Sequence, residues 1–269
     1  MTAGNERLHA VVHDGDGPLA FLVHGALGSR SYWHDNLGAL QTVCRPVVIE
    51  LWGHGRSPSP ADPERYRPHS YVAEFERLRV ELDADRAWMI GQSLGAALAL
   101  HYVLAQPAHV IGAVLTNSSS AFSEPVVWAE RTETLVEERA LEVEAHGIEV
   151  LRDSWINPGR SKRISPAVRA KLAGEFSEHD ATGLVNTFRF TNAGVPLGDR
   201  LRNVAVPVLL TNGTEEGRFQ HLLARARQIP ELEIADLPAS HAVNAQDPAG
   251  WNAAAIRFIR QHAGTQHVH

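Results

Sequence analysis

Short apolar runs alternate with longer segments of helical periodicity along most of the chain. The apolar runs with the length and side chains of buried strands lie at residues 8–12, 19–23, 47–49, 87–90, 110–115, 206–210 and 232–235. Helical patterns separate most of these runs, over residues 31–40, 71–82, 94–106, 219–229 and 248–262. Strands that alternate with helices predict an α/β fold with a mostly parallel, doubly wound sheet.

The first two apolar runs are joined by turn residues instead of a helix. Residues 14–18 have the sequence Asp-Gly-Asp-Gly-Pro. Glycine, aspartate and proline favour tight turns, and a tight turn between two apolar runs is the usual signal of a hairpin. We therefore expect residues 8–23 to form an N-terminal β-hairpin.

One long stretch interrupts the alternation of strands and helices. From about residue 122 to about residue 202 the pattern is helical, and no strong strand pattern occurs. An all-helical insertion between two strands of a parallel sheet predicts a cap over the carboxyl edge, where ligands of open α/β sheets bind. We expect residues 1–121 and 203–269 to form the α/β core, and residues 122–202 to form a helical cap.

Composition and charge narrow the class of protein. A chain of 269 residues can form one large α/β domain with an insertion or two small domains. The net charge of −6 without a basic run argues against a nucleic-acid partner. No apolar run approaches the ~20 residues of a membrane span, and the polar N-terminus does not resemble a signal peptide. With Cys44 as the only cysteine, a reducing, cytoplasmic location is the default expectation.

The segment from Gly91 to Gly95 combines a Gly-x-Ser-x-Gly motif with the context that this motif requires. An apolar strand pattern precedes it and a strong helix former follows it, as in a nucleophile elbow. The elbow is a strained turn, so the residues two before and two after Ser93 must be small. The serine then stands at a helix N-terminus, which favours negative charge. A glycine-rich turn with an incidental serine is the alternative, and the flanking pattern disfavours it.

A serine nucleophile needs a base and a group that orients the base. In folds of this type an acid and then a histidine follow the serine along the chain. His241 is the candidate base, because it lies in the loop between the run 232–235 and the last predicted helix. A histidine in that loop can reach the carboxyl edge of the sheet.

Glutamates supply the candidate acid. The loop after the run 206–210 contains no aspartate but does contain Glu215 and Glu216. Either carboxylate could hold the imidazole in the required tautomer, and we favour Glu216. Glu124, which follows the run 110–115, is an alternative.

Two backbone N–H groups are the candidate oxyanion donors. An acyl-transfer site needs donors for the negative charge that develops on the carbonyl oxygen. The glycine-rich loop after the run 19–23 lets the backbone approach a ligand closely. We expect the N–H groups of Ala26 and Leu94 to bind the oxyanion.

Motifs spread over most of the chain carry a family resemblance. They comprise His24-Gly25 with Gly28, Gly53-His54-Gly55-Arg56-Ser57, Gly91-Gln92-Ser93-Leu94-Gly95, Val206-Pro207-Val208 with Gly213-Thr214-Glu215-Glu216, and Ser240-His241. In their order and spacing the chain resembles the α/β-hydrolase fold superfamily, in its soluble, cap-bearing, single-domain branch. The resemblance implies Ser93 as nucleophile, His241 as base and Glu216 as acid, where the family most often has aspartate. It implies no catalytic role for His54.

These features together predict a serine hydrolase that cleaves a small ester, lactone or thioester through an acyl-enzyme. The superfamily also includes C–C bond hydrolases and lyases that use the triad to remove a proton, and the serine motif does not separate these reactions. A non-catalytic binding protein on the same fold is a third alternative.

No metal-ligand spacing or phosphate loop occurs, so we expect no metal and no cofactor. We expect a small acyl substrate as the partner, with Trp128, Trp155 and Phe188 in its pocket. The oligomeric state, including a homo-oligomer, stays open.

Overall fold

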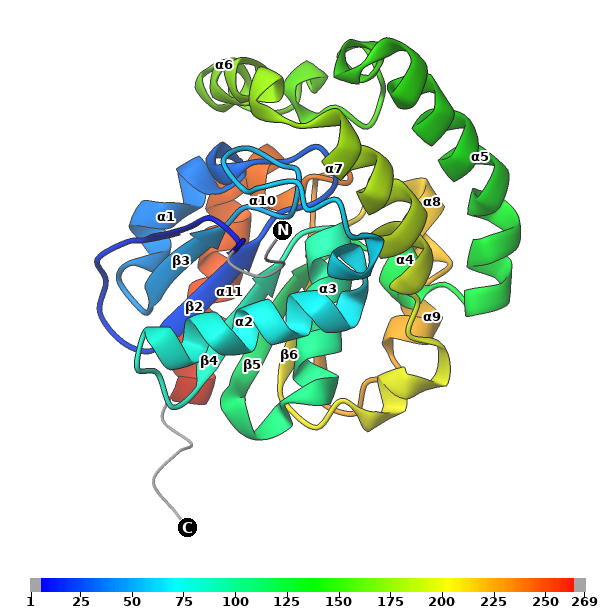
Figure 1. Cartoon of the computed structure of the whole chain (residues 1–269). Helices are drawn as coiled ribbons and strands as arrows, with labels where there is room; N and C mark the ends of the chain where they lie inside the picture. The colour runs from blue at the N-terminus through cyan, green and yellow to red at the C-terminus, as the bar shows by residue number, and fades with distance from the viewer. Residues whose placement is uncertain (1–5, 264–269) are drawn as a thin grey trace.

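The computed structural model describes residues 6–263, and it confirms the predicted α/β fold with a mostly parallel sheet. Within these residues one seven-stranded sheet has the order β1-β3-β2-β4-β5-β6-β7 (Figure 1). Only the pair β1–β3 is antiparallel, and all other neighbouring strands in this described part are parallel. The strands are β1 (Ala10–Val12), β2 (Leu19–Val23), β3 (Arg45–Ile49), β4 (Ala87–Gly91), β5 (Val110–Thr116), β6 (Val208–Gly213) and β7 (Leu232–Leu237).

The prediction of an N-terminal β-hairpin is wrong. β1 pairs with β3, with Ala10 opposite Ile49, and β3 separates β1 from β2. The turn residues form a wider loop that crosses the segment between α1 and β3, and the N–H of Asp16 donates to the carbonyl of Gln41 in this segment at 2.9 Å. The glycines of this loop allow it to lie against the backbone of residues 43–45. Their small size therefore permits close contact between two backbone segments and does not form a tight hairpin turn.

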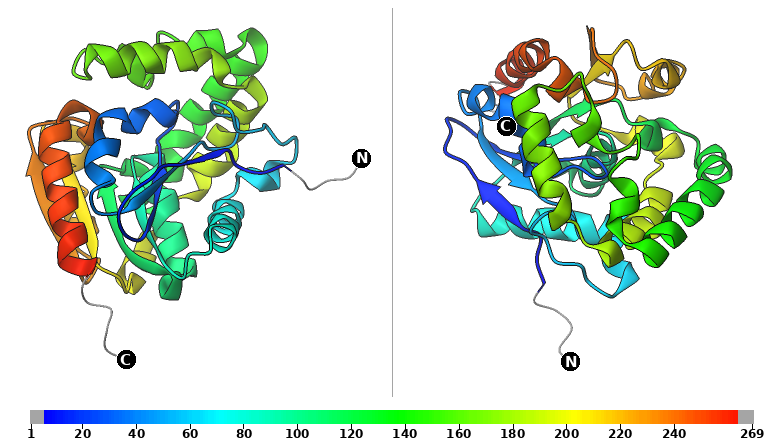
Figure 2. Two further views of the ribbon diagram at one scale, coloured as in Figure 1. Left: turned by 90° about the vertical axis from the view of Figure 1, so that its left-hand side faces the viewer. Right: turned by 90° about the horizontal axis from the view of Figure 1, so that it is seen from above.

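Helices cover both faces of the sheet (Figures 1 and 2). On β2, Phe21 packs in a hydrophobic cluster with side chains of α2 (Pro68–Glu81) and α3 (Leu94–Ala105). Its neighbour Leu22 packs in a second cluster with side chains of α1 (His34–Leu40) and α11 (Pro248–Ala263). Successive residues of a strand point to opposite faces, so the continuous apolar runs of this sheet supply both clusters.

One predicted helix near the end of the chain is divided in the structure. The helical pattern over 219–229 corresponds to two short helices, α8 (Gly217–Gln220) and α9 (Leu223–Ala226). The N–H of Leu222 donates to the carbonyl of Phe219, three residues back, at 2.8 Å. This tighter bond ends the first helix, since an α-helix requires bonds four residues back. α10 (Val243–Gln246) precedes α11.

A helical insertion separates β5 from β6 and lies above the sheet in Figure 2. Its elements follow α4 (Ser119–Phe122) and are α5 (Pro125–His146), α6 (Pro166–Glu175), α7 (Ala181–Asn186) and the π-helical segment η7 (Thr187–Asn192). The insertion has its own hydrophobic cluster, which includes Val143, Phe176 and Leu184 and also Leu27 from the loop after β2. We call residues 125–192 the cap. No helix within residues 6–263 is both long enough and apolar enough to cross a bilayer.

Candidate active site

Ser93 stands at a strained turn between β4 and α3. Its backbone has φ 52° and ψ −115°, and positive φ costs a non-glycine residue roughly 1–3 kcal/mol. A Cβ added to Gly91 would lie 2.5 Å from the Cα of Ala96, and one added to Gly95 would lie 2.0 Å from the carbonyl oxygen of Val23. The two glycines are therefore required by the close approach of backbone on either side of the serine.

The structure brings Ser93, His241 and Glu216 together. The hydroxyl Oγ of Ser93 lies 2.9 Å from Nε2 of His241. On the other side of the ring, Nδ1 lies 3.0 Å and 3.1 Å from the two carboxylate oxygens of Glu216. With its proton on Nδ1, the imidazole donates to the carboxylate and accepts from the serine hydroxyl. The three residues follow β4, β7 and β6, whose carboxyl ends meet at one edge of the sheet.

Glu216 is held in place by a residue that sequence reasoning missed. The amide nitrogen of Asn117 donates to Oε2 of Glu216 at 2.9 Å, and the amide oxygen accepts from the N–H of Gly213 at 3.1 Å. Burial raises the pKa of Glu216. Hydrogen bonds from His241 and Asn117 and the charge of the imidazole lower this pKa by a larger amount, so the net shift is downward. Asn117 directly follows β5, the neighbour of β6. This position at the carboxyl end of a strand is the feature of the sequence that could have indicated a place next to Glu216.

The two other candidate acids lie elsewhere. Glu215 forms an ion pair with Arg163, and both side chains are about half exposed. Glu124 forms an ion pair with Arg225 at the surface. The structure therefore places only Glu216 of the three glutamates against His241.

The two predicted oxyanion donors belong to the loop after β2 and the start of α3. Ala26 and Leu94 line the same cavity as Ser93. Leu94 is the first residue of α3, and the first N–H groups of a helix have no carbonyl partner within it. Beside Ala26, the N–H of Leu27 donates to Nε2 of His54 at 3.3 Å. That bond fixes the loop that carries Ala26.

Two buried histidines, His24 and His54, accept hydrogen bonds from backbone N–H groups near the site. Nε2 of His24 accepts from the N–H of Leu51 at 3.1 Å, as Nε2 of His54 does from Leu27. Burial lowers the pKa of His24 to about 4 and that of His54 well below 6.5. Both rings are therefore neutral near pH 7, which these acceptor roles require.

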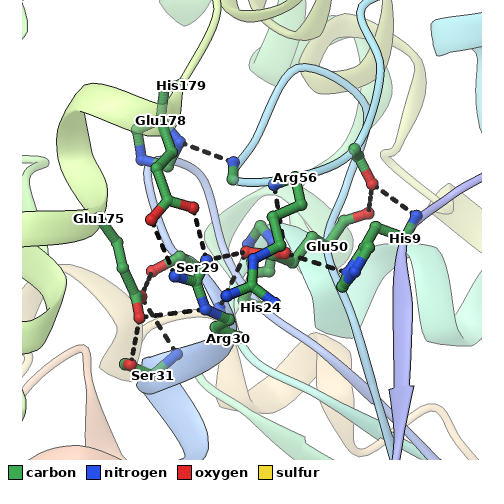
Figure 3. A network of polar contacts seen from close by, with 12 residues as sticks. His9, His24, Ser29, Arg30, Ser31, Glu50, Arg56, Glu175, Glu178 and His179 are labelled. Atoms are coloured by element: carbon green, nitrogen blue, oxygen red, sulfur yellow. Dashed lines mark hydrogen bonds and ion pairs between the residues drawn. The ribbon is translucent and has the colours of Figure 1, made fainter.

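A network of charged side chains joins the loop after β2 to the cap (Figure 3). Arg30 lies at its centre and contacts Glu50 at 3.2 Å, Glu175 at 3.3 Å and Glu178 at 2.7 Å. Glu50 follows β3 and is fully buried, while the two other glutamates belong to the end of α6 and the turn after it. Ser29 donates to Glu175 as well. The network ties the loop carrying Ala26 to the cap.

A cavity of about 650 Å³ lies between the core and the cap. Its core side includes Ser93 and His241, and its cap side includes Trp128, Trp155 and Phe188, the aromatic residues expected there. This volume is within the usual range for a small-molecule site. In the described residues, 6–263, no group of three or more His, Cys, Asp and Glu side chains is arranged to hold a metal ion.

Comparison with known proteins identifies the family. A model of the alpha/beta hydrolase fold matches residues 18–248. The chain therefore belongs to the α/β-hydrolase fold family.

Relatives in this family have different named activities. The chain is 24% identical to the putative 2-succinyl-6-hydroxy-2,4-cyclohexadiene-1-carboxylate synthase of Bacillus subtilis, over 92% of the chain and 93% of the relative. It is 26% identical to a pimeloyl-[acyl-carrier protein] methyl ester esterase of Nitrosospira multiformis, over 91% and 96%. Among solved structures, MenH from S. aureus matches with a TM-score of 0.84 at 18% identity, covering 94% of this chain and 98% of that one. Likeness at this level shows a shared fold.

Proposed function

We propose that the protein is a serine hydrolase that cleaves a small ester, lactone or thioester through an acyl-enzyme. The observation that carries the proposal is the continuous hydrogen-bonded chain from Ser93 through His241 to Glu216. Ser93, at one end of this hydrogen-bonded series, lines a cavity large enough for a small acyl compound.

In the proposed reaction, Ser93 Oγ attacks the substrate carbonyl while Nε2 of His241 takes the hydroxyl proton. The tetrahedral intermediate collapses, and the imidazolium returns the proton to the leaving alcohol or thiol. Water then attacks the acyl-enzyme with His241 again as base, and this step releases the acid and restores Ser93. Glu216 holds the imidazole in the required tautomer and balances its charge in the imidazolium form.

The N–H groups of Ala26 and Leu94 would bind the oxygen that becomes negative in both steps. Backbone donors of this kind need no reorganisation during the reaction, and one such donor contributes roughly 10²–10³-fold to the rate. The strained turn at Ser93 and the bond between Leu27 and His54 support this proposal, because they fix the two backbone segments that carry the donors.

Covalent labelling tests the proposal directly. A fluorophosphonate probe should label the wild-type protein at Ser93, and peptide mass spectrometry identifies the modified residue. Ser93→Ala should not be labelled, and His241→Ala should be labelled far more slowly. Folded wild-type protein that takes no label would refute the nucleophile assignment. A panel of p-nitrophenyl esters and lactones of graded length would then define the acyl group.

A lyase reaction on the same three residues is the second candidate. The Bacillus subtilis relative is named a synthase, and this favours a reaction in which His241, through Ser93, removes a proton from carbon and no acyl-enzyme forms. Product analysis distinguishes the two. Hydrolysis in H₂¹⁸O places one ¹⁸O atom in the acid product, whereas proton-initiated elimination incorporates none.

A further inference from the structure

Arginines gather at the cavity although the chain as a whole is acidic, with a net charge of −6. Those that line it are Arg131, Arg139, Arg160, Arg163 and Arg218. Among the lining residues that the structure describes, Glu216 is the one carboxylate. Its charge is already bound by His241 and Asn117. The cavity therefore presents an excess of positive charge.

Not all of these arginines are available to a ligand. Arg160 forms an ion pair with Asp153, and Arg163 forms one with Glu215. Arg131, Arg139 and Arg218 form no ion pair within 4.0 Å among residues 6–263, and of these three only Arg139 is partly shielded from solvent, since Arg131 and Arg218 are exposed. Arg139 contrasts with Arg189 on the same cap, which is bound by two glutamates of α5.

Arg139 is also the best placed of the cavity arginines to bind an anion. It projects from α5, is half-buried, and its guanidinium carbon lies 6.0 Å from the ring centre of Trp155 and 5.9 Å from that of Phe188. The guanidinium of Arg218 lies 4.6 Å from the same Trp155 ring, so two cations flank one aromatic side chain. Burial lowers the pKa of Arg139, and the charge of Glu142 offsets this effect only in part. This direction means that the protein does not fully replace the hydration that the cation has lost.

We propose that the acyl substrate carries a second, anionic group, a carboxylate, and that Arg139 binds this carboxylate with Arg218 beside it. The inference rests on the proposed function, in which the acyl carbonyl lies at Ser93. A planar guanidinium matches a carboxylate with two parallel N–H donors. Trp155 and Phe188 lie next to the guanidinium and line the same cavity, so they would contact the carbon chain between the two ends of the substrate.

Matched boronic acids test the inference without requiring turnover, because a boronic acid binds a serine nucleophile reversibly. Pentylboronic acid ends in a methyl group, and 4-carboxybutylboronic acid has a similar length but ends in a carboxylate. Calorimetry should give a Kd for the carboxylate compound that is roughly 10- to 100-fold lower, as expected for charge-assisted hydrogen bonds in a half-buried site. Arg139→Met should remove most of this preference and leave the Kd of pentylboronic acid unchanged.

Two further variants locate the effect. Arg139→Lys retains the charge without the forked donors, and it should keep only part of the preference. Arg160→Met removes a cavity arginine that is already paired, and it should retain the full preference. If Arg139→Met and Arg160→Met lose the preference for the carboxylate compound to the same extent, the preference comes from the total positive charge of the cavity. That result would overturn the assignment to Arg139.

The outcomes separate this inference from the function on which it rests. If both boronic acids bind with equal affinity and Ser93→Ala weakens both, the serine nucleophile stands and the carboxylate inference is wrong. If neither compound depends on Ser93, the proposed function fails and the inference fails with it.

Discussion

Replacing Arg30 with methionine removes the cation at the centre of the network in Figure 3. The side chain is 20% exposed, and its partner Glu50 is fully buried. Removal of one partner from a buried ion pair typically costs about 3–5 kcal/mol, because the remaining charge loses its compensation. Glu50 keeps contacts with His9 at 3.3 Å and with the N–H of Arg56 at 3.2 Å. We therefore expect the lower end, a loss of about 3 kcal/mol in the free energy of unfolding.

Urea unfolding followed by circular dichroism measures this loss. Arg152→Met is the matched control, since Arg152 makes a two-pronged contact with Glu149 in which the side chains are 41% and 62% exposed. Its removal should cost about 1 kcal/mol or less. The double variant Arg30→Met with Glu50→Gln removes the uncompensated charge as well, and it should recover part of the loss. A loss below about 1 kcal/mol for Arg30→Met, or no recovery in the double variant, would refute the reasoning.

Three further predictions concern the site and its supports. Glu216→Gln should lower kcat by on the order of 10³-fold or more, whereas Glu215→Gln should change it by less than about threefold because its ion pair is exposed; the reverse order would move the acid to Glu215. Gly95→Ala should destabilise the fold by more than about 2 kcal/mol through overpacking, while Gly174→Ala, with nothing within 4 Å of the added Cβ, should be neutral or stabilising by up to ~1 kcal/mol. His24 has its pKa lowered by burial from 6.5 to about 4, so the unfolded chain takes up a proton in this range that the folded protein does not. The free energy of unfolding should therefore fall as pH decreases from about 6.5 to about 4, and urea midpoints that stay constant from pH 7 to pH 5 would contradict this.

The sequence predicted those parts of the fold that depend on local pattern. The position of Ser93 follows from a strand, two glycines and a helix that are adjacent in the chain. His241 could be located because parallel strands bring their carboxyl ends to one edge, so that a loop after a late strand reaches the same place as the elbow. The arrangement of β1 depends instead on which strand it meets in space. Turn residues between two apolar runs do not determine that choice.

Side-chain roles that depend on contacts between distant segments could not be predicted. Glu215 and Glu216 are neighbours of the same type, and only the direction of each side chain from the loop after β6 separates them. Asn117 contacts Glu216 across 99 positions of the chain. Arg139 lies on a helix with many charges, and the pattern of that helix does not show which of them face the cavity.

The placement of charge at the site is consistent with an anionic substrate near Glu216, the proposed catalytic carboxylate. Glu216 would repel a substrate carboxylate if its charge were exposed, but the side chain is 5% exposed and lies behind His241. The imidazole and Asn117 bind its oxygens, so these partners compensate its negative charge. Arg139 approaches from α5 of the cap and Arg218 from α8 of the core, and both guanidinium groups lie near the ring of Trp155. Because electrostatic interactions weaken in water and strengthen where water is excluded, a substrate that displaces water from this cavity would be attracted by the arginines more strongly than it is repelled by the shielded glutamate.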